Sequence, residues 1–333
     1  MARVQRSRRD LLKLGASVSG GLLLARDARA VNAEPRNLGA PLGAYSERSP
    51  FEQAARTWRR ESKTPETGSS FTPIQESLGI ITPSALHYER HHSGVPAIDP
   101  REHRLIVRGL VERPLSLSVA DLKRLPSISR ILAMECGGNS AGEWNTPGAD
   151  VQRSHGMVSG SEWTGVSLGM LLRELGVQPK ASWVIAEGGD ACRMMRSIPL
   201  QKAMDDSFLA YGQNGEALRP AQGYPLRLVN PGWEGNTNVK WLRNLILADQ
   251  PYMARDETSK YSDLMPDGRA RIFTYTMEAK SVVTFPSGGQ TLPGRGLFEV
   301  SGLAWSGRGS VARVEVTVDG GASWHVARLQ EPR

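Results

Sequence analysis

The sequence has few cysteines and, after its N-terminal segment, no long apolar run. Its 333 residues include two cysteines, Cys136 and Cys192, which are too few for a disulfide framework. They form no CxxC or CxxCH motif, which disfavours covalent haem and a structural zinc site. Beyond residue 30 no stretch reaches the ~18 apolar residues that a bilayer span requires. We therefore expect no membrane span, and any one-electron acceptor must be another protein.

The positive charge is concentrated at the N-terminus. Residues 1–30 hold seven arginines and lysines against two aspartates, so most of the formal net charge of +7 lies there. The remaining chain is nearly neutral and has no run of interleaved basic and aromatic residues, which argues against a nucleic-acid surface. Hydrophobic residues make up 39% and charged residues 23%, as in ordinary globular proteins. We therefore expect a folded chain and no nucleic-acid partner.

The first 30 residues have the layout of an export signal. The paired Arg8 and Arg9 resemble the twin-arginine signal, which serves proteins that load their cofactor before export. An apolar run follows, and Ala28 and Ala30 are small residues flanking a possible cleavage point. The alternative is a basic amphipathic helix that stays on the protein. We predict a twin-arginine signal peptide over residues 1–30 and a periplasmic location.

The remaining sequence divides into three segments that differ in composition and periodicity. Residues 31–75 are rich in Pro, Gly and Ser with little periodicity, which predicts an extended arm. Residues 76–265 alternate short β-type runs with helical patterns and predict a mixed α+β domain. Residues 266–333 show strand-type patterns alone and predict an immunoglobulin-like β-sandwich. Such a sandwich needs about seven strands and only three or four fit before Arg333, so we expect it to be incomplete at its C-terminus.

Local patterns predict individual elements. Ser118 is a candidate N-cap for a helix that Pro126 closes. We predict helices over residues 118–125 and 168–175, and strands over residues 105–111, 131–134, 183–186 and 226–229. In the last segment we predict strands over 297–302, 311–318 and 324–326, with a turn at 319–321.

Cys136 is the first candidate for chemistry. It stands where a predicted strand runs out into Gly137 and Gly138. Thiolate binds soft metals, and glycines allow close approach of the backbone to a neighbouring group. A single cysteine after a strand is, however, more often a small buried hydrophobe. These residues alone leave both interpretations open, whereas the setting of Cys192 indicates a structural residue.

Four stretches, in their order and spacing, resemble the sulfite oxidase family of molybdenum enzymes. They are Thr82–Pro96, Glu135–Ser140, Gly223–Gly232 and Asn238–Leu242. The resemblance covers about residues 75–330 and includes that family's dimerisation domain at the C-terminal end. Within the family, Tyr88–His92 and Glu135–Ser140 resemble most the molybdopterin subunits of sulfane dehydrogenases of the bacterial sulfur-oxidising (Sox) system.

The resemblance implies a role for each matching residue. Cys136 would be the protein ligand to molybdenum, and Arg90 and Tyr261 would face the substrate. The residues implied to hold molybdopterin are Tyr88, Glu89, Arg90, His91, His92, Asp190, Gln222, Arg227, Asn238, Val239 and Lys240. Cations suit its phosphate, and amides suit its orientation. Gln222 replaces a residue that is often histidine in animal relatives.

The implied function is oxidation of a sulfur compound at molybdenum, after which electrons leave singly to a c-type cytochrome subunit. In sulfite-oxidising animal relatives an arginine follows the ligand cysteine by five residues, and that position is Ala141 here. We therefore expect a sulfane sulfur presented on a cysteine of a carrier protein rather than free sulfite. A homodimer through the C-terminal domain is possible. The alternatives are a sulfite dehydrogenase, a protein-methionine-sulfoxide reductase and a non-catalytic binding module.

Overall fold

The structure is a computed structural model that describes residues 41–333, except 61–63, 146–149, 288 and 331–333. The predicted signal peptide and the first ten residues of the predicted arm lie outside the described residues. Residues 54–333 form one compact unit, separate from residues 1–53, and that unit holds all elements named below. Across the described residues, no helix has the length and apolarity that crossing a membrane requires.

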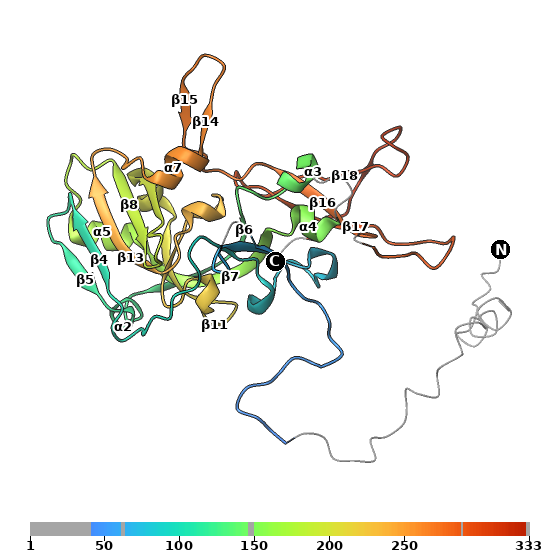
Figure 1. The fold of residues 1–333 in the computed structure, drawn as a ribbon, viewed down its shortest axis with the longest axis horizontal. Coiled ribbons are helices and arrows are strands. Elements are labelled where there is room, and N and C mark those ends of the chain that lie inside the picture. The colour runs from blue at the N-terminus through green and yellow to red at the C-terminus, as the bar shows by residue number, and fades with distance from the viewer. Residues whose placement is uncertain (1–40, 61–63, 146–149, 288, 331–333) are drawn as a thin grey trace, which may run out of the picture. The chain divides into compact units, whose positions relative to one another are not determined.

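Two five-stranded sheets form the frame of the main domain (Figure 1). The first contains β6 (Ser127–Glu135), β7 (Val158–Ser167), β10 (Phe208–Gln213), β11 (Glu216–Ala217) and β12 (Arg227–Val229). The second contains, in spatial order, β5 (Leu115–Leu117), β4 (Leu105–Gly109), β13 (Leu242–Ala248), β8 (Trp183–Gly188) and β9 (Met195–Pro199). The second sheet is antiparallel except where β4 pairs with β13. This mixed architecture agrees with the predicted α+β domain.

The largest hydrophobic core joins the second sheet to helix α5 (Leu168–Leu175). Leu168, Leu171, Leu172 and Leu175 are buried because their spacing places them on one face of the helix. The side chain of Ser167 caps the N-terminus of α5 by accepting from Met170 N at 3.2 Å. The predicted helix over 168–175 is confirmed.

Most other predicted elements of this domain are present with shifted ends. The strands predicted at 105–111, 131–134, 183–186 and 226–229 are β4, β6, β8 and β12. Strand β6 begins earlier than predicted because it pairs with β7 along its whole length, including its polar first half. The helix predicted over 118–125 is confirmed but shorter, as α2 (Val119–Leu122), with a capping box between Ser118 and Asp121.

The second half of the predicted arm is part of the packed domain. Strands β1 (Thr57–Arg60) and β2 (Gly68–Phe71) form an antiparallel sheet with β3 (Arg90–His91). Phe71 and Ile74 are buried beside this sheet. The sheet therefore brings β1 and β2 beside the Tyr88–His92 motif, an arrangement that the weak periodicity of this segment did not indicate.

The C-terminal segment consists of three separate antiparallel pairs among the described residues. They are β14 (Ser262–Leu264) with β15 (Ala270–Ile272), β16 (Lys280–Phe285) with β17 (Ser301–Trp305), and β18 (Glu315–Val316) with β19 (His325–Val326). The strand predicted over 297–302 is wrong in position, because the β16 ladder pairs residues 301–305 and leaves Leu297 exposed. The strand predicted over 311–318 is reduced to β18, because pairing with β19 involves two residues of each strand.

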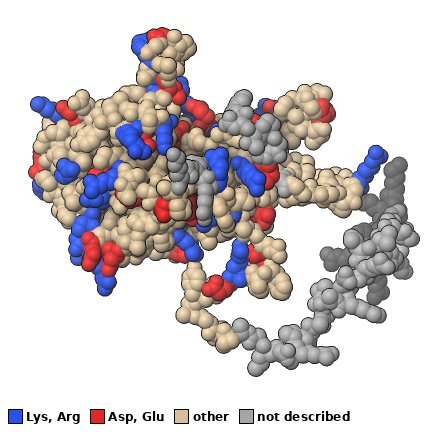
Figure 2. All heavy atoms as spheres, viewed as in Figure 1, with Lys and Arg blue, Asp and Glu red and all other residues tan. Residues whose placement is uncertain are grey.

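Charged side chains of both signs occur across the face shown in Figure 2. Many form ion pairs between neighbours in sequence, such as Arg101 with Asp99 and Arg269 with Asp267. Exposed pairs of this kind contribute little to stability, because water screens the two charges.

Candidate active site

One cavity collects almost all of the predicted site residues. It encloses about 700 Å³ of empty space, including its open mouth. Every predicted site residue except Glu89 lines it. The lining also includes His87, Met134, Met194, Gly235, Asn236 and Trp241, which the sequence did not single out as site residues. Residues from distant parts of the chain thus converge on one concave site.

Cys136 lines this cavity and directly follows β6. Its backbone N–H donates to Met157 O at 3.0 Å, and its carbonyl accepts from Asn139 N at 2.9 Å. Burial raises the pKa of the Cys136 thiol, whereas the Gly138 N–H and the positive charge of Arg90 oppose that shift. A bound metal ion would deprotonate such a thiol. The thiol therefore lies where a metal ion bound in the cavity could be coordinated by it.

Glu135, beside the cysteine, is held by three donors. Its carboxylate accepts from Asn139 Nδ2 at 2.9 Å, from Lys280 Nζ at 2.7 Å and from Trp305 Nε1 at 2.9 Å. Lys280 and Trp305 belong to β16 and β17, so the C-terminal pair is attached to the strand that ends at Cys136. No sequence pattern indicated this attachment, because the partners lie 145 and 170 positions apart.

Tyr261 and Arg90 line the cavity near Cys136. Tyr261 is the C-cap of helix α7 (Arg255–Lys260), and burial, followed by the nearby Cys136, raises the pKa of its phenol. Arg90 donates to the backbone carbonyl of His91 at 2.5 Å. The pKa of His92 is lowered to about 4 by burial and by Arg90, so this imidazole is neutral near pH 7. The phenol of Tyr261 and the guanidinium of Arg90 thus act on the thiol, and the neutral His92 imidazole lines the same cavity.

Lys240 is another cation that lines the cavity. Its Nζ donates to Arg90 O at 3.2 Å, to Ala221 O at 3.0 Å and to His91 Nδ1 at 3.0 Å. Burial, reinforced by Arg227, lowers the pKa of Lys240 to about 7. Its ammonium group is therefore poorly stabilised by the protein alone and suits an anionic ligand.

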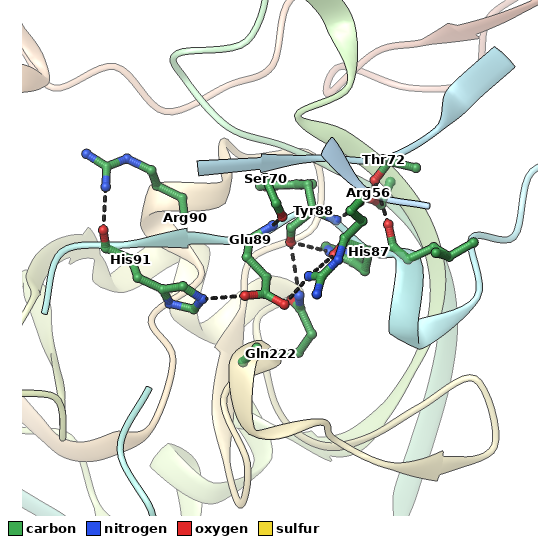
Figure 3. Close-up of polar contacts among 12 residues, drawn as sticks. Arg56, Ser70, Thr72, His87, Tyr88, Glu89, Arg90, His91 and Gln222 are labelled. Carbon is green, nitrogen blue, oxygen red and sulfur yellow. Dashed lines mark hydrogen bonds and ion pairs between the residues drawn. The ribbon is translucent and has the colours of Figure 1, made fainter. Parts of the chain in front are cut away.

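A chain of polar contacts links His91, Glu89 and Arg56 (Figure 3), and Lys240 donates to its first member. Because Lys240 donates to His91 Nδ1, the other ring nitrogen of His91 carries the hydrogen and donates to Glu89 at 2.8 Å. Glu89 also pairs with Arg56. Burial alone would raise the pKa of Glu89, but His91 and Arg56 hold it at about 2. Glu89, predicted to bind the cofactor, does not line the cavity, and its carboxylate accepts from His91, which does.

Arg227 is almost fully buried at 2% exposure. It donates to Gln222 O at 3.0 Å and to Asn238 O at 2.9 Å, and its Nε has no acceptor among the described residues. Burial lowers the pKa of Arg227 to about 10, so the guanidinium stays charged at neutral pH. Its Cζ lies 4.7 Å from the ring centroid of Trp163. This cation is fixed in place with one donor unused.

The side-chain amides of the predicted residues Gln222 and Asn238 form hydrogen bonds with the protein backbone. Gln222 Nε2 donates to Tyr88 O at 2.9 Å. Asn238 Nδ2 donates to Glu234 O at 2.9 Å, and its Oδ1 accepts from Asn230 N at 2.7 Å. Both side chains therefore shape the cavity wall. Asp190 accepts from Ser93 at 3.2 Å and from Cys192 at 2.8 Å, while Val239 contributes an apolar surface.

Comparisons with known proteins identify the family. Residues 92–255 match the oxidoreductase molybdopterin binding domain, and residues 271–333 match the Mo-co oxidoreductase dimerisation domain. The solved structure of the sulfane dehydrogenase SoxCD from Paracoccus pantotrophus is 43% identical, with a TM-score of 0.82, and the match covers 88% of this chain and 78% of that chain. The chain belongs to the sulfite oxidase family.

Other family members are also similar. The mitochondrial sulfite oxidase of Drosophila melanogaster is 35% identical over 76% of this chain and 48% of its own length. The NAD(P)H nitrate reductase of Hordeum vulgare is 34% identical over 82% of this chain and 34% of its own length. This chain thus spans less than half of these curated relatives. The predicted family, fold class, cofactor and enzyme class are confirmed, and the alternative of a non-catalytic binding module is not supported.

The cavity fits the molybdenum-molybdopterin cofactor of the sulfite oxidase family. Cys136 offers a thiolate for the metal, while Lys240 and Arg227 offer positive charge for the phosphate. His87 is buried, and its Nδ1–H donates to Tyr88 O at 3.0 Å, so its unpartnered Nε2 can accept from an N–H of the pterin. Burial lowers the pKa of His87 to about 3, which keeps it neutral for that role. The donor set therefore matches each part of the cofactor.

Proposed function

We propose that this chain is the molybdopterin subunit of a sulfane dehydrogenase, which oxidises sulfane sulfur on a carrier-protein cysteine and passes electrons to a c-type cytochrome. The 43% identity to SoxCD over 88% of the chain supports this proposal. The sequence also supports export by the twin-arginine pathway to the periplasm. The match of residues 271–333 to a dimerisation domain supports a homodimer.

The observation that carries the proposal is the charge distribution around Cys136. Arg90, Arg227 and Lys240 are the described arginine and lysine side chains that line the cavity, and all three donate to backbone carbonyls there. Arg90 is the cation whose charge acts on Cys136. Ala141, at the start of α3 (Ala141–Asn145), is exposed and contributes no positive charge. A free dianion is held best by clustered cations, so this site favours a less charged, protein-bound sulfur.

Each residue around Cys136 has its own role in the proposed reaction. The bound cofactor would supply two-electron redox chemistry, while Cys136 would hold its metal. Arg90 and Tyr261 would orient the sulfur substrate by hydrogen bonds from the guanidinium and phenol. His92, neutral near pH 7, would add no charge beside them.

The test compares kcat/KM for carrier-bound sulfane and for free sulfite on the molybdenum-loaded enzyme, with cytochrome c as acceptor. We expect the carrier-bound substrate to be preferred at least tenfold, about 1.4 kcal/mol of transition-state discrimination. Introducing Ala141→Arg should raise kcat/KM for sulfite relative to sulfane, and Ala141→Gln controls for bulk. A tenfold preference for sulfite by the parent enzyme would contradict the proposal.

Sulfite oxidation is the second candidate function. It is favoured by the 35% and 34% identity to the sulfite oxidases of Drosophila melanogaster and Gallus gallus. The same assay identifies it, because this function predicts sulfite as the better substrate. Running the assay in the reducing direction with a reduced dye and protein-bound methionine sulfoxide tests the reductase alternative.

A further inference from the structure

Arg196 is a fully buried cation whose nitrogens have no hydrogen-bond acceptor. It lies on β9 with 0% exposure, and Nε, Nη1 and Nη2 all lack a partner among the described residues. Three aromatic rings surround it. Its Cζ is 4.5 Å from the ring centroid of Tyr261, 5.7 Å from that of Phe273 and 5.9 Å from that of Tyr275. The guanidinium is thus held mainly by ring faces, of which Tyr261 is the nearest.

The nearest carboxylate does not satisfy this cation. Glu257 Oε1 lies 4.0 Å from Arg196 Nε, beyond hydrogen-bond distance. Instead, Glu257 accepts from the backbone N–H and, at 2.9 Å, the hydroxyl of Ser197, and from Ala254 N at 3.0 Å. These bonds anchor the start of α7 to β9. Burying an arginine without hydrogen bonds is costly. The most specific contact that this arrangement leaves for Arg196 is with Tyr261.

Tyr261 separates Arg196 from the cavity. Tyr261 lines the cavity together with Cys136, whereas Arg196 does not. Both backbone polar groups of Tyr261 are bonded: its N–H donates to Glu257 O of α7 at 3.3 Å, and its carbonyl accepts from Thr274 N, just after β15, at 3.1 Å. The backbone contacts leave the plane of the ring undefined, and a cation on one face defines it.

We propose that Arg196 is a positioning residue for Tyr261, fixing the plane of the phenol and thereby the place of its hydroxyl beside the substrate. This inference rests on the substrate-facing role of Tyr261 in the proposed function. Displacement of a reacting group by about 1 Å can cost roughly 100-fold in rate. Arg196 touches no substrate, so its loss should lower kcat more than it changes KM.

The first test is a double-mutant cycle on the molybdenum-loaded enzyme. We expect Arg196→Met to lower kcat at least about tenfold, with KM changed less than about threefold. In a Tyr261→Phe background, where no hydroxyl remains to be positioned, the same substitution should lower kcat less than about twofold. Arg196→Lys keeps the charge without the planar stack, and it should lose less kcat than Arg196→Met. It also serves as the test variant if Arg196→Met fails to fold.

Ile198→Ala is the matched control. Ile198 lies two residues along β9, is 1% exposed and belongs to the main hydrophobic core. It should lose stability while kcat per bound molybdenum stays at the parent value. If Arg196 were merely structural, its substitution would lower kcat by the same factor in both backgrounds, which would overturn the inference.

A second readout needs no activity. The ¹⁹F resonance of 3-fluorotyrosine at position 261 should shift and broaden in Arg196→Met but not in Ile198→Ala, with or without cofactor. An unchanged resonance would overturn the inference. The outcomes distinguish the role of Tyr261 from that of Arg196. Full activity of Tyr261→Phe would show that the Tyr261 hydroxyl has no role in turnover. An impaired Tyr261→Phe enzyme with a fully active Arg196→Met enzyme overturns only the role of Arg196. The cycle can use whichever sulfur substrate the enzyme turns over.

Discussion

At the scale of single residues, Lys240 gives a prediction about cofactor binding. Its pKa is lowered to about 7 in the free cavity, mainly by burial. A bound phosphate would favour the ammonium form and raise this pKa, so binding takes up a proton. We therefore expect the affinity of cofactor-free protein for molybdopterin to weaken as the pH rises above about 7, by up to ~10-fold per unit. Titration calorimetry between pH 6 and 9 measures this.

The matched variants make this prediction specific. Lys240→Gln should bind the cofactor more weakly, with the pH dependence above 7 removed. Lys202→Gln is the control, because Lys202 pairs with Asp206 away from the cavity. An affinity of the parent protein that does not change between pH 7 and 9 would contradict the role assigned to Lys240.

The sequence predicts the residues that line the cavity better than it predicts their supports. Cys136, Lys240 and Tyr261 were placed through motif resemblance, and the structure brings them to one cavity. Their supports follow no motif. Arg56 reaches Glu89 across 33 positions, in a segment whose composition indicated only an extended arm. Such contacts arise from tertiary packing, which local patterns do not encode.

At the scale of elements, the β16–β17 pair should stabilise the strand that ends at Cys136. Trp305 is buried and donates to Glu135 at 2.9 Å. Trp305→Phe removes this donor and leaves a buried carboxylate oxygen with one partner fewer. We expect the free energy of unfolding to fall by about 1–3 kcal/mol, as measured by urea denaturation. The exposed Trp324 provides the control, and Trp324→Phe should change stability by less than ~0.5 kcal/mol. Equal effects of the two substitutions would refute the attachment.

Elements with local start and stop signals were predictable, and elements defined by their partners were not. The Ser167 cap and leucine spacing identify α5, and the Ser118 capping box identifies α2. By contrast, β18 and β19 contain two residues each, and their ends depend on which residues meet across the pair. The alternating pattern over 311–318 therefore predicted a longer strand than the structure has.

At the scale of the whole molecule, we expect the predicted signal peptide to determine the compartment in which the loaded enzyme accumulates. Replacing Arg8 and Arg9 together by lysine should block twin-arginine export and leave the molybdenum-loaded protein in the cytoplasm. Immunoblotting of periplasmic and cytoplasmic fractions measures this. Replacing Arg3 and Arg6 by lysine is the matched control and should leave export intact. Unchanged periplasmic accumulation of the Arg8 and Arg9 variant would contradict twin-arginine export.

The most direct test of Cys136 as the protein ligand to molybdenum is X-ray absorption at the molybdenum edge, measured on the loaded enzyme and on Cys136→Ser. If Cys136 is the protein ligand, the variant keeps its fold and bound pterin but shows one sulfur fewer around molybdenum. A hydroxyl is a poorer soft ligand than a thiolate, so kcat should fall at least ~100-fold. Cys192→Ser should match the parent in both measurements, since Cys192 does not line the cavity and a serine hydroxyl can still donate to Asp190. An unchanged number of sulfur neighbours in Cys136→Ser, with parental turnover, would contradict the assignment of the site.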